Sequence, residues 1–369
     1  MDETDVAPAE SAFAFTGNWR EFAPIAFTNL LLTIVTLGIY RFWATARERR
    51  YLWSRTRFID DRLEWTGTGL ELFIGFLLVF ALLLGPIVFL QFGLQAMVLR
   101  GYTGIAVLIT LAVYIFIFYL VGVARFRALR YRLSRTHWHG IRGGADDQGF
   151  AYGWSYIWRT TVGYLALGLM VPWSMTTLWN ERWRHMSFGP HRFDADAQWN
   201  SIFGRYMIFY LSPILLLIVL GILIAVGAVA VGSLGGFNTS GPPQGGALAA
   251  IIIAGIAFYL LFFVALGLVA MIYYSAFYRE AIGAVTLSTL HFGFTARTKD
   301  WIWLFVGNVA LVVVTLGIGL IFLRYRNWKF FITHLEAFGE VDLDLLTQSR
   351  TREPGQGEGL LDAFDVGAI

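Results

Sequence analysis

The sequence predicts an all-α integral membrane protein built around two transmembrane hairpins. Of its 369 residues, 57% are hydrophobic and only 14% are charged, whereas a soluble domain carries about 25% charged residues. About 20 helical residues are needed to span the hydrocarbon core of a bilayer. Four segments approach or exceed this length without one charged side chain, namely residues 72–90, 103–124, 206–232 and 247–272. The N-terminus is acidic and polar, which is not the pattern of a secretory signal.

The basic residues indicate which loops face the cytoplasm. Of the 28 lysines and arginines, 26 lie in residues 41–69, 125–159, 180–205, 273–301 and 324–352. Cytoplasmic loops carry an excess of basic residues, so we expect these segments, and the C-terminus, to be inside. The loop that holds Arg100 and the uncharged loop 233–246 should face outward. The net charge of +3 is then explained by basic residues in the cytoplasmic loops, and no nucleic-acid partner is predicted.

Three weaker apolar segments, residues 21–40, 160–179 and 302–323, each contain a sequence that breaks helices. These breaks are Thr36-Leu37-Gly38, Val171-Pro172-Trp173 and Thr315-Leu316-Gly317. The second and third segments have basic residues on both flanks, and a single crossing cannot put both flanks inside. We therefore expect three re-entrant or interfacial segments that pack against the hairpins. Seven ordinary spans are the alternative.

Parts of the chain recur at fixed offsets, which predicts two to three pseudo-repeats. The string FTGNWREFAPIAFTNLLLTIVTLGI, from Phe15, aligns with FTARTKDWIWLFVGNVALVVVTLGI, from Phe294. The repeat core is Thr36, Leu37, Gly38 and Ile39, which returns as Thr315, Leu316, Gly317 and Ile318. In a second register, RERRYLWSRT (47–56) aligns with RALRYRLSRT (127–136). We divide the chain into an acidic tail (1–14), a first unit (15–149), a second unit (150–293), a partial third unit (294–349) and a polar tail (350–369).

A short stretch of alternating apolar and polar residues follows each basic segment. These stretches hold Gly or Asp near an aromatic residue, which is typical of strands and tight turns. They are residues 56–67, 136–144, 186–196, 289–297 and 334–344. We expect them to join into a small β-sheet on the cytoplasmic side.

One group of motifs resembles a known family. Asn29 is followed after six residues by TLGIYRFWA, then by Arg-x-x-Arg-Tyr from Arg47 and by Phe-x-x-x-Arg-Leu-Glu-Trp-Thr-Gly from Phe58. This pattern resembles the YjgN-like bacterial inner-membrane proteins, a family of unknown function. The resemblance implies a multi-pass protein of the bacterial inner membrane, and it supplies no catalytic residues.

Two asparagines are candidate binding residues at membrane depth. The four strong spans hold no ionisable side chain, which argues against a proton-coupled carrier of the usual kind. Asn29 and Asn308 lie in the weaker segments and occupy equivalent places in the repeat. They can line a substrate path, although hydrogen bonding between helices explains them equally well.

Four arginines are candidate lipid-binding residues. Two pairs, Arg47 with Arg50 and Arg127 with Arg130, recur at a spacing of three residues, which places each pair on one helix face. With the aromatic residues beside them, these helices suit the headgroup layer of the bilayer. The pairs serve either as ordinary anchors or as a specific site for an anionic headgroup at the cytoplasmic face.

No catalytic or metal-binding constellation is evident. The chain has no cysteine, and His137 and His139 could share a strand face, but no third ligand has a supportive spacing. We therefore predict no metal, no cofactor and no enzyme. For the function we expect a transport or channel-like protein whose repeats enclose a path. The alternative is a lipid-binding or membrane-organising protein without transport, and a lipid-modifying enzyme is the second alternative.

Overall fold

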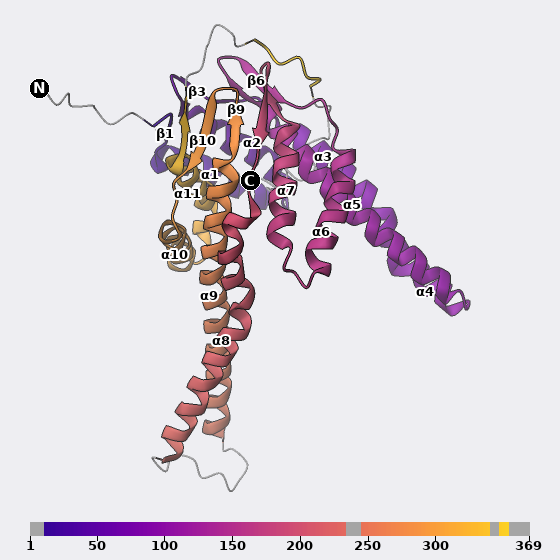
Figure 1. Ribbon diagram of the computed structural model, residues 1–369, viewed down its shortest axis with the longest axis vertical. Coiled ribbons are helices and arrows are strands. Elements are labelled where there is room, and N and C mark those ends of the chain that lie inside the picture. Colours follow the sequence, from indigo (N-terminus) through magenta and orange to yellow (C-terminus); the bar gives the residue numbers. More distant parts are fainter. Residues whose placement is uncertain (1–10, 234–244, 340–346, 354–369) are drawn as a thin grey trace, which may run out of the picture.

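Two long helical hairpins project from one end of the molecule, and a β-sheet lies at the other end (Figure 1). The structure is a computed structural model, and it describes residues 11–233, 245–339 and 347–353. The two tails of the chain that were predicted as polar, and the centre of the loop 233–246, fall largely outside the described residues.

The two hairpins are the predicted transmembrane hairpins. In the first, α3 (Gly69–Val88) continues through a π-helical turn, η1 (Phe89–Gly93), into α4 (Leu94–Leu99), and α5 (Thr103–Arg135) returns. In the second, α8 (Trp199–Ser233) runs beside α9 (Gly245–Gly283). Within the described residues, four helices are long and apolar enough to cross a membrane, and at most 11% of the most apolar window of each is buried in the protein. Their side chains therefore face the surrounding medium, as expected for helices in lipid.

The three weaker segments form helical hairpins that turn back. We keep the name re-entrant hairpins from the prediction for these three, which are α1 (Trp19–Val35) with α2 (Arg41–Ser54), α6 (Phe150–Leu165) with α7 (Val171–Arg184), and α10 (Thr298–Val314) with η2 (Ile318–Phe322) and α11 (Leu323–His334). Their first helices have 16 or 17 residues. At about 1.5 Å per residue each is about 25 Å long, shorter than the roughly 30 Å hydrocarbon core. In Figure 1 the α6–α7 hairpin is visibly shorter than α8 and α9.

The same backbone geometry makes all three turns. A leucine and a glycine with positive φ follow one another at each tip: 52° and 91° at Leu37-Gly38, 53° and 82° at Leu167-Gly168, and 50° and 94° at Leu316-Gly317. The prediction that Val171-Pro172-Trp173 is the second break was wrong. That sequence begins α7, where proline is tolerated because the first N–H groups of a helix have no partner within it.

The tips are apolar and exposed. The turn leucines Leu37, Leu167 and Leu316 are 93%, 79% and 94% exposed in the protein. Exposed leucines at the ends of three hairpins are costly in water and favourable in hydrocarbon. The three tips therefore suit insertion into the bilayer.

The β-structure is larger than predicted, so the prediction of an all-α fold was wrong. An antiparallel eight-stranded sheet has the order β11-β10-β9-β8-β7-β6-β5-β4, and a three-stranded sheet has the order β1-β2-β3. All five predicted stretches contribute strands. The strands are β1 (Phe13–Phe15), β2 (Thr56–Phe58), β3 (Asp61–Arg62), β4 (Glu64–Trp65), β5 (Thr136–Trp138), β6 (Ile141–Gly144), β7 (Ser187–Phe188), β8 (His191–Ala195), β9 (Val285–Leu287), β10 (Leu290–Phe294) and β11 (Leu335–Phe338).

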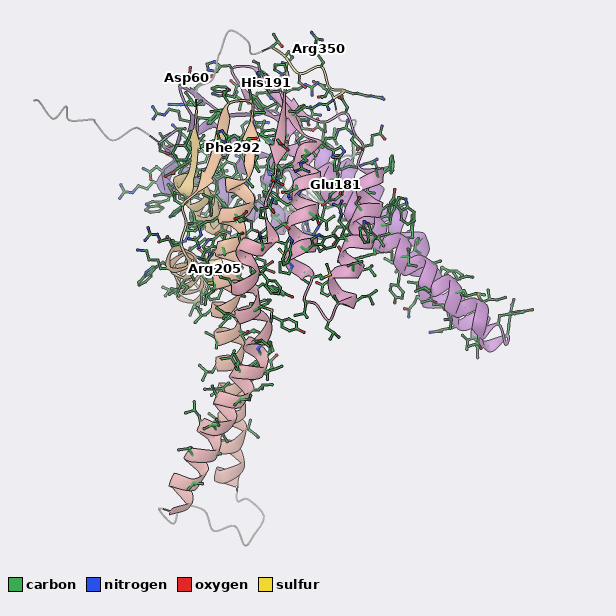
Figure 2. All side chains as sticks on the ribbon, in the orientation of Figure 1. Asp60, Glu181, His191, Arg205, Phe292 and Arg350 are labelled. Atoms are coloured by element: carbon green, nitrogen blue, oxygen red, sulfur yellow. The ribbon has the colours of Figure 1, made fainter. Side chains whose placement is uncertain are left out.

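Helices lead almost directly into strands, which ties their C-terminal ends to the sheet. α5 ends at Arg135 and β5 begins at the next residue, and α11 likewise ends where β11 begins. Tryptophans pack where the helices meet the strands. Trp53 Nε1 donates to Thr136 Oγ1 at 2.9 Å, and the Trp53 and Trp328 rings stack with centroids 4.0 Å apart. Figure 2 places Asp60, His191 and Arg350 at this end of the molecule.

Part of the predicted C-terminal tail also lies on the sheet. The backbone oxygen of Thr351 accepts a hydrogen bond from the buried Arg142 on β6. Gln348 Oε1 accepts from the Arg142 backbone N–H at 3.2 Å, and Gln348 Nε2 donates to Gly140 O at 2.9 Å. Residues 347–353 therefore form a strap across the β5–β6 hairpin.

Candidate functional site

A cavity of about 920 Å³ lies between the basic helices and the sheet. We call it the chamber. Its walls come from α1, α2, the C-terminal part of α5, α7, α9 and α11, and strands β8 and β10 contribute Phe193 and Phe292. Figure 2 labels Phe292 on the sheet above the helices. Most lining side chains are aliphatic or aromatic, so the chamber suits an apolar occupant.

One end of the chamber lies near the tips of the first and third re-entrant hairpins. Leu30 and Thr33, on the last two turns of α1, line it there together with Leu320 of η2. Leu320 is 58% exposed, so the lining continues to the outer surface at this end. Since the exposed tips suit insertion in hydrocarbon, this is the end of the chamber that would face a bilayer.

The polar lining of the chamber is dominated by arginine. Five arginines and one carboxylate line it: Arg41, Arg49, Arg132, Arg182, Arg324 and Glu48. The carboxylate is engaged, because Arg324 Nη1 lies 2.7 Å from Glu48 Oε2 and Asn29 Nδ2 donates to Glu48 Oε1 at 3.2 Å. The formal charge of these lining side chains is therefore +4, in a space walled mainly by apolar groups.

Arg182 stands apart from the other lining arginines. It is 6% exposed, and its guanidinium makes no hydrogen bond or ion pair with another residue that the structure describes. Its Nε is buried without a partner, and its guanidinium carbon lies 5.3 Å from the centre of the Trp179 ring. Burial lowers the pKa of Arg182, Tyr152 opposes that shift, and the neighbouring Arg125 and Arg132 reinforce it. A desolvated cation without a counter-ion is costly, so this position favours an anion.

Of the six predicted binding residues, Asn29 alone lines the chamber. Its Nδ2 also donates to Ala44 O at 3.3 Å, and its Oδ1 accepts from Arg47 Nη1 at 3.4 Å. Asn308 makes the equivalent bond, with Arg326 Nε 2.7 Å from its Oδ1. Both asparagines therefore hold the two helices of a re-entrant hairpin together, which is the packing role weighed for them from the sequence.

The other predicted arginines lie elsewhere. Arg47 and Arg50 are exposed, Arg127 donates to Gln148 O at 3.0 Å, and the buried Arg130 reaches Arg352 O in the C-terminal strap at 3.4 Å. The recurring spacing that singled out these arginines marks a helix face other than the one that lines the chamber.

The chamber face of α2 follows a helical period that the sequence does contain. Thr45, Glu48, Arg49 and Leu52 are spaced as i, i+3, i+4 and i+7, and all four line the chamber. Looking for the buried face of each basic helix, instead of for recurring pairs, would have selected Arg49.

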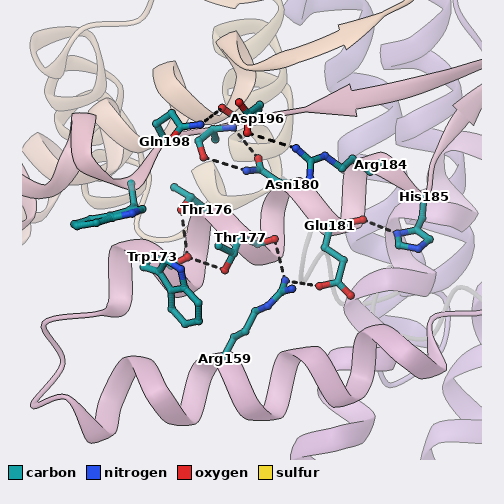
Figure 3. A pocket seen from close by; sticks show the side chains of 12 residues that line it. Arg159, Trp173, Thr176, Thr177, Asn180, Glu181, Arg184, His185, Asp196 and Gln198 are labelled. Carbon is teal, nitrogen blue, oxygen red and sulfur yellow. Dashed lines mark hydrogen bonds and ion pairs between the residues drawn. The ribbon is translucent and has the colours of Figure 1, made fainter.

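A second pocket of about 490 Å³ lies between α6, α7 and the start of α8 (Figure 3). Its polar groups satisfy one another. Arg159 pairs with Glu181, and Asn180 bonds both the N–H and the C=O of Ala197, at 2.9 and 3.0 Å. Arg184 reaches Asp194 at 3.1 Å. These contacts clasp α7 to the segment that leads into α8, so we interpret the pocket as structural.

The two histidines considered for a metal site do not lie on the same strand. His137 lies on β5, whereas His139 is a turn residue with φ of 49°. His139 Nε2 lies 3.0 Å from Asp60 Oδ1, and this contact lowers the pKa of Asp60. Among the described residues, no group of three or more histidine or acidic side chains could hold a metal ion.

Comparison with known proteins assigns a family. A family described as bacterial protein of unknown function (DUF898) matches residues 10–363. The chain belongs to the DUF898 family. The DUF898 chain is 31% identical over 142 residues to the inner membrane protein YjgN of Escherichia coli O157:H7, which covers 38% of this chain and 32% of that protein. It is 28% identical over 130 residues to the YjgN of Salmonella typhimurium strain LT2, which covers 35% and 30%.

The aligned region thus spans about a third of each curated relative. No solved structure matches this DUF898 protein. The resemblance to YjgN-like proteins is confirmed, and the chain is a multi-pass member of a bacterial inner-membrane family of unknown function.

Proposed function

We propose that this protein binds a lipid or another long amphiphilic molecule in the chamber, at the level where the membrane meets the sheet. The observation that carries the proposal is the chamber itself, about 920 Å³ in volume and lined mostly by apolar side chains. Its membrane-facing end lies at Thr33 and the exposed Leu320. Basic pockets between membrane helices on the cytoplasmic side are typical sites for lipid headgroups.

Lipid retention by the purified full-length protein tests this proposal. The protein would be extracted in detergent, washed, and reloaded from micelles that contain dioleoyl phosphatidylethanolamine and dioleoyl phosphatidylglycerol, and bound lipid would be counted by native mass spectrometry. We expect Thr33→Trp, which fills the membrane-facing end, to reduce retention severalfold. Leu31→Trp is the matched control, because Leu31 is 62% exposed on the same helix and does not line the chamber. Equal retention by both variants would contradict the proposal.

Transport is the second candidate function, and a specific observation favours it. The chamber reaches Asn29 inside a re-entrant hairpin, and transporters place their sites beside helices that break at membrane depth. The same asparagine–arginine bond recurs at Asn308, which supports the predicted pseudo-repeats. Movement of fluorescent phospholipid between leaflets of vesicles that hold the purified protein would distinguish transport from binding alone.

An enzyme acting on lipids is the third function. Glu48 is the one carboxylate among the described residues that line the chamber, and Arg324 and Asn29 both engage it. Because a general acid or base must be within reach of the reacting group, this geometry favours binding over chemistry.

A further inference from the structure

Arginines line the chamber near both of its ends. Arg41 and Arg324, at the starts of α2 and α11, lie near the hairpin tips, and Arg324 pairs with Glu48. Arg49, Arg132 and Arg182 lie in the C-terminal halves of α2, α5 and α7, within five residues of the ends of those helices. Because these ends run into the strands, the three arginines lie at the sheet end of the chamber. The opposite end, at Leu30 and Leu320, is lined by residues near the hairpin tips.

Arg182 is the lining residue whose environment most requires a ligand. Polar atoms buried in native proteins almost always have a partner, and Arg182 Nε has none among the described residues. The largest electrostatic influences on it come from Tyr152 and Tyr278, which are neutral near pH 7, and from two further cations, Arg125 and Arg132. None of these supplies a negative charge.

An oxyanion would supply both the negative charge and the hydrogen-bond acceptor that Arg182 lacks. Guanidinium groups bind phosphate and carboxylate through paired, charge-assisted hydrogen bonds. A small free anion would leave most of the apolar wall without a partner, whereas an acidic amphiphile would cover both ends of the chamber. Arg182 also lies at the sheet end of the chamber, where the headgroup of a lipid in the adjoining leaflet would be.

We propose that Arg182 is the residue that binds the acidic headgroup, a phosphate or a carboxylate, of the amphiphile held in the chamber. This inference rests on the proposed function and adds to it the chemical class of the ligand and the residue that selects it. The alkyl chains lie along the apolar wall toward Leu30 and Leu320.

The test compares two lipids of equal chain length on the intact protein. Dioleoyl phosphatidic acid and dioleoylglycerol, which has the same chains and no phosphate, would each be titrated in mixed micelles against the delipidated protein, with bound lipid counted by native mass spectrometry. A hydrogen bond to a charged group contributes roughly 1.5–3 kcal/mol, so we expect about a tenfold or greater preference for phosphatidic acid. Arg182→Gln should lose that preference, and Arg182→Lys should keep part of it because the charge remains.

Arg184→Gln is the matched control. Arg184 lies on the same helix, pairs with Asp194 and Asp196, and does not line the chamber, so its replacement should leave the preference unchanged. If Arg182 had only a structural role, the lipid-free Arg182→Gln variant would instead have a lower melting temperature than the lipid-free wild-type protein. We expect the melting temperature of the lipid-free variant to be equal or higher, because a desolvated charge is removed.

Three outcomes would overturn the inference. Equal binding of the two lipids by the wild-type protein would do so, while leaving the proposed lipid binding intact. An unchanged preference in Arg182→Gln would do so as well. Displacement of phosphatidic acid by inorganic phosphate at equal concentration would assign the arginine to a soluble anion. If neither lipid is retained at all, the proposed function fails instead. Should Arg182→Gln not fold, Arg182→Lys decides, because a full wild-type preference in that variant would contradict the assignment to Arg182.

Discussion

The turn glycines of the re-entrant hairpins offer a direct test of the fold. Gly38 and Gly317 have φ of 91° and 94°, in the left-handed region that other L-residues adopt at a cost of about 1–2 kcal/mol. A Cβ built on either glycine meets no atom within 4 Å, so steric contact adds nothing. Alanine would also stiffen the unfolded chain, which returns roughly 0.4–1 kcal/mol. We therefore expect Gly38→Ala and Gly317→Ala each to lower the free energy of unfolding by about 1 kcal/mol.

The matched control is a glycine inside a membrane helix. Gly221 of α8 also has open space around its Cβ, but its backbone is helical, so alanine there should be neutral or stabilising by up to about 1 kcal/mol. The free energies would be measured by unfolding in mixed micelles with increasing fractions of dodecyl sulfate, followed by circular dichroism. Losses of equal size in Gly38→Ala and Gly221→Ala would refute the assigned turn geometry.

Three further predictions concern packing, topology and pH. Asn29→Leu should lower the free energy of unfolding by about 1–3 kcal/mol in the same titration, because it leaves buried polar partners unpaired. Asn308 is only half-buried, so Asn308→Leu should lower it by less, and the reverse order would contradict this reasoning. Since the chain lacks cysteine, single cysteines at Asp194 and Arg100 should react with an impermeant thiol reagent from opposite sides of the membrane, with Asp194 on the cytoplasmic side; labelling of both from one side would exclude the arrangement. Burial lowers the pKa of His137 from its ordinary value of 6.5, so the folded protein binds this proton less readily than the unfolded chain does. The contribution of His137 to the free energy of unfolding should therefore be constant above pH 6.5 and should fall below pH 6.5 as the pH approaches the lowered pKa. His137→Gln should flatten that decline, which unfolding titrations at pH 5 and pH 7 would measure.

The spans and strands were accessible from the sequence because each has a local signal. Uninterrupted apolar length identified the two hairpins, and alternation beside turn residues identified the five stretches that hold strands. The full sheet was not accessible, because its order depends on pairings between segments far apart in the chain. Glu64 pairs with His137, and Phe193 pairs with Leu287. Nothing within either stretch specifies such a neighbour.

The second turn shows how a strong local signal can mislead. Proline at position 172 is the most obvious helix breaker in its segment, yet it sits in the first turn of α7, where it is harmless. The break lies at Leu167-Gly168, and its equivalence to Leu37-Gly38 is clear only from the backbone angles. In the α1–α2 hairpin, Thr36 Oγ1 accepts a hydrogen bond from the Tyr40 N–H at 2.9 Å. The equivalent residue of the α6–α7 hairpin is Ala166, so the turn motif is less recognisable in that sequence.

The position of the chamber follows from how helices and strands are joined. A sheet with exposed edges and turns cannot lie in hydrocarbon, because its polar backbone groups would lack partners there. The sheet must therefore lie outside the bilayer, while the apolar tips at Leu37 and Leu316 suit the inside. Since α2, α5 and α7 run from membrane depth to the sheet, arginines near their C-terminal ends, such as Arg182, are held at the boundary. The enclosed space therefore has Arg49, Arg132 and Arg182 on its aqueous side, whereas Arg324 on its lipid side is paired with Glu48. A headgroup bound at Arg182 would have the orientation of a lipid in the adjoining leaflet.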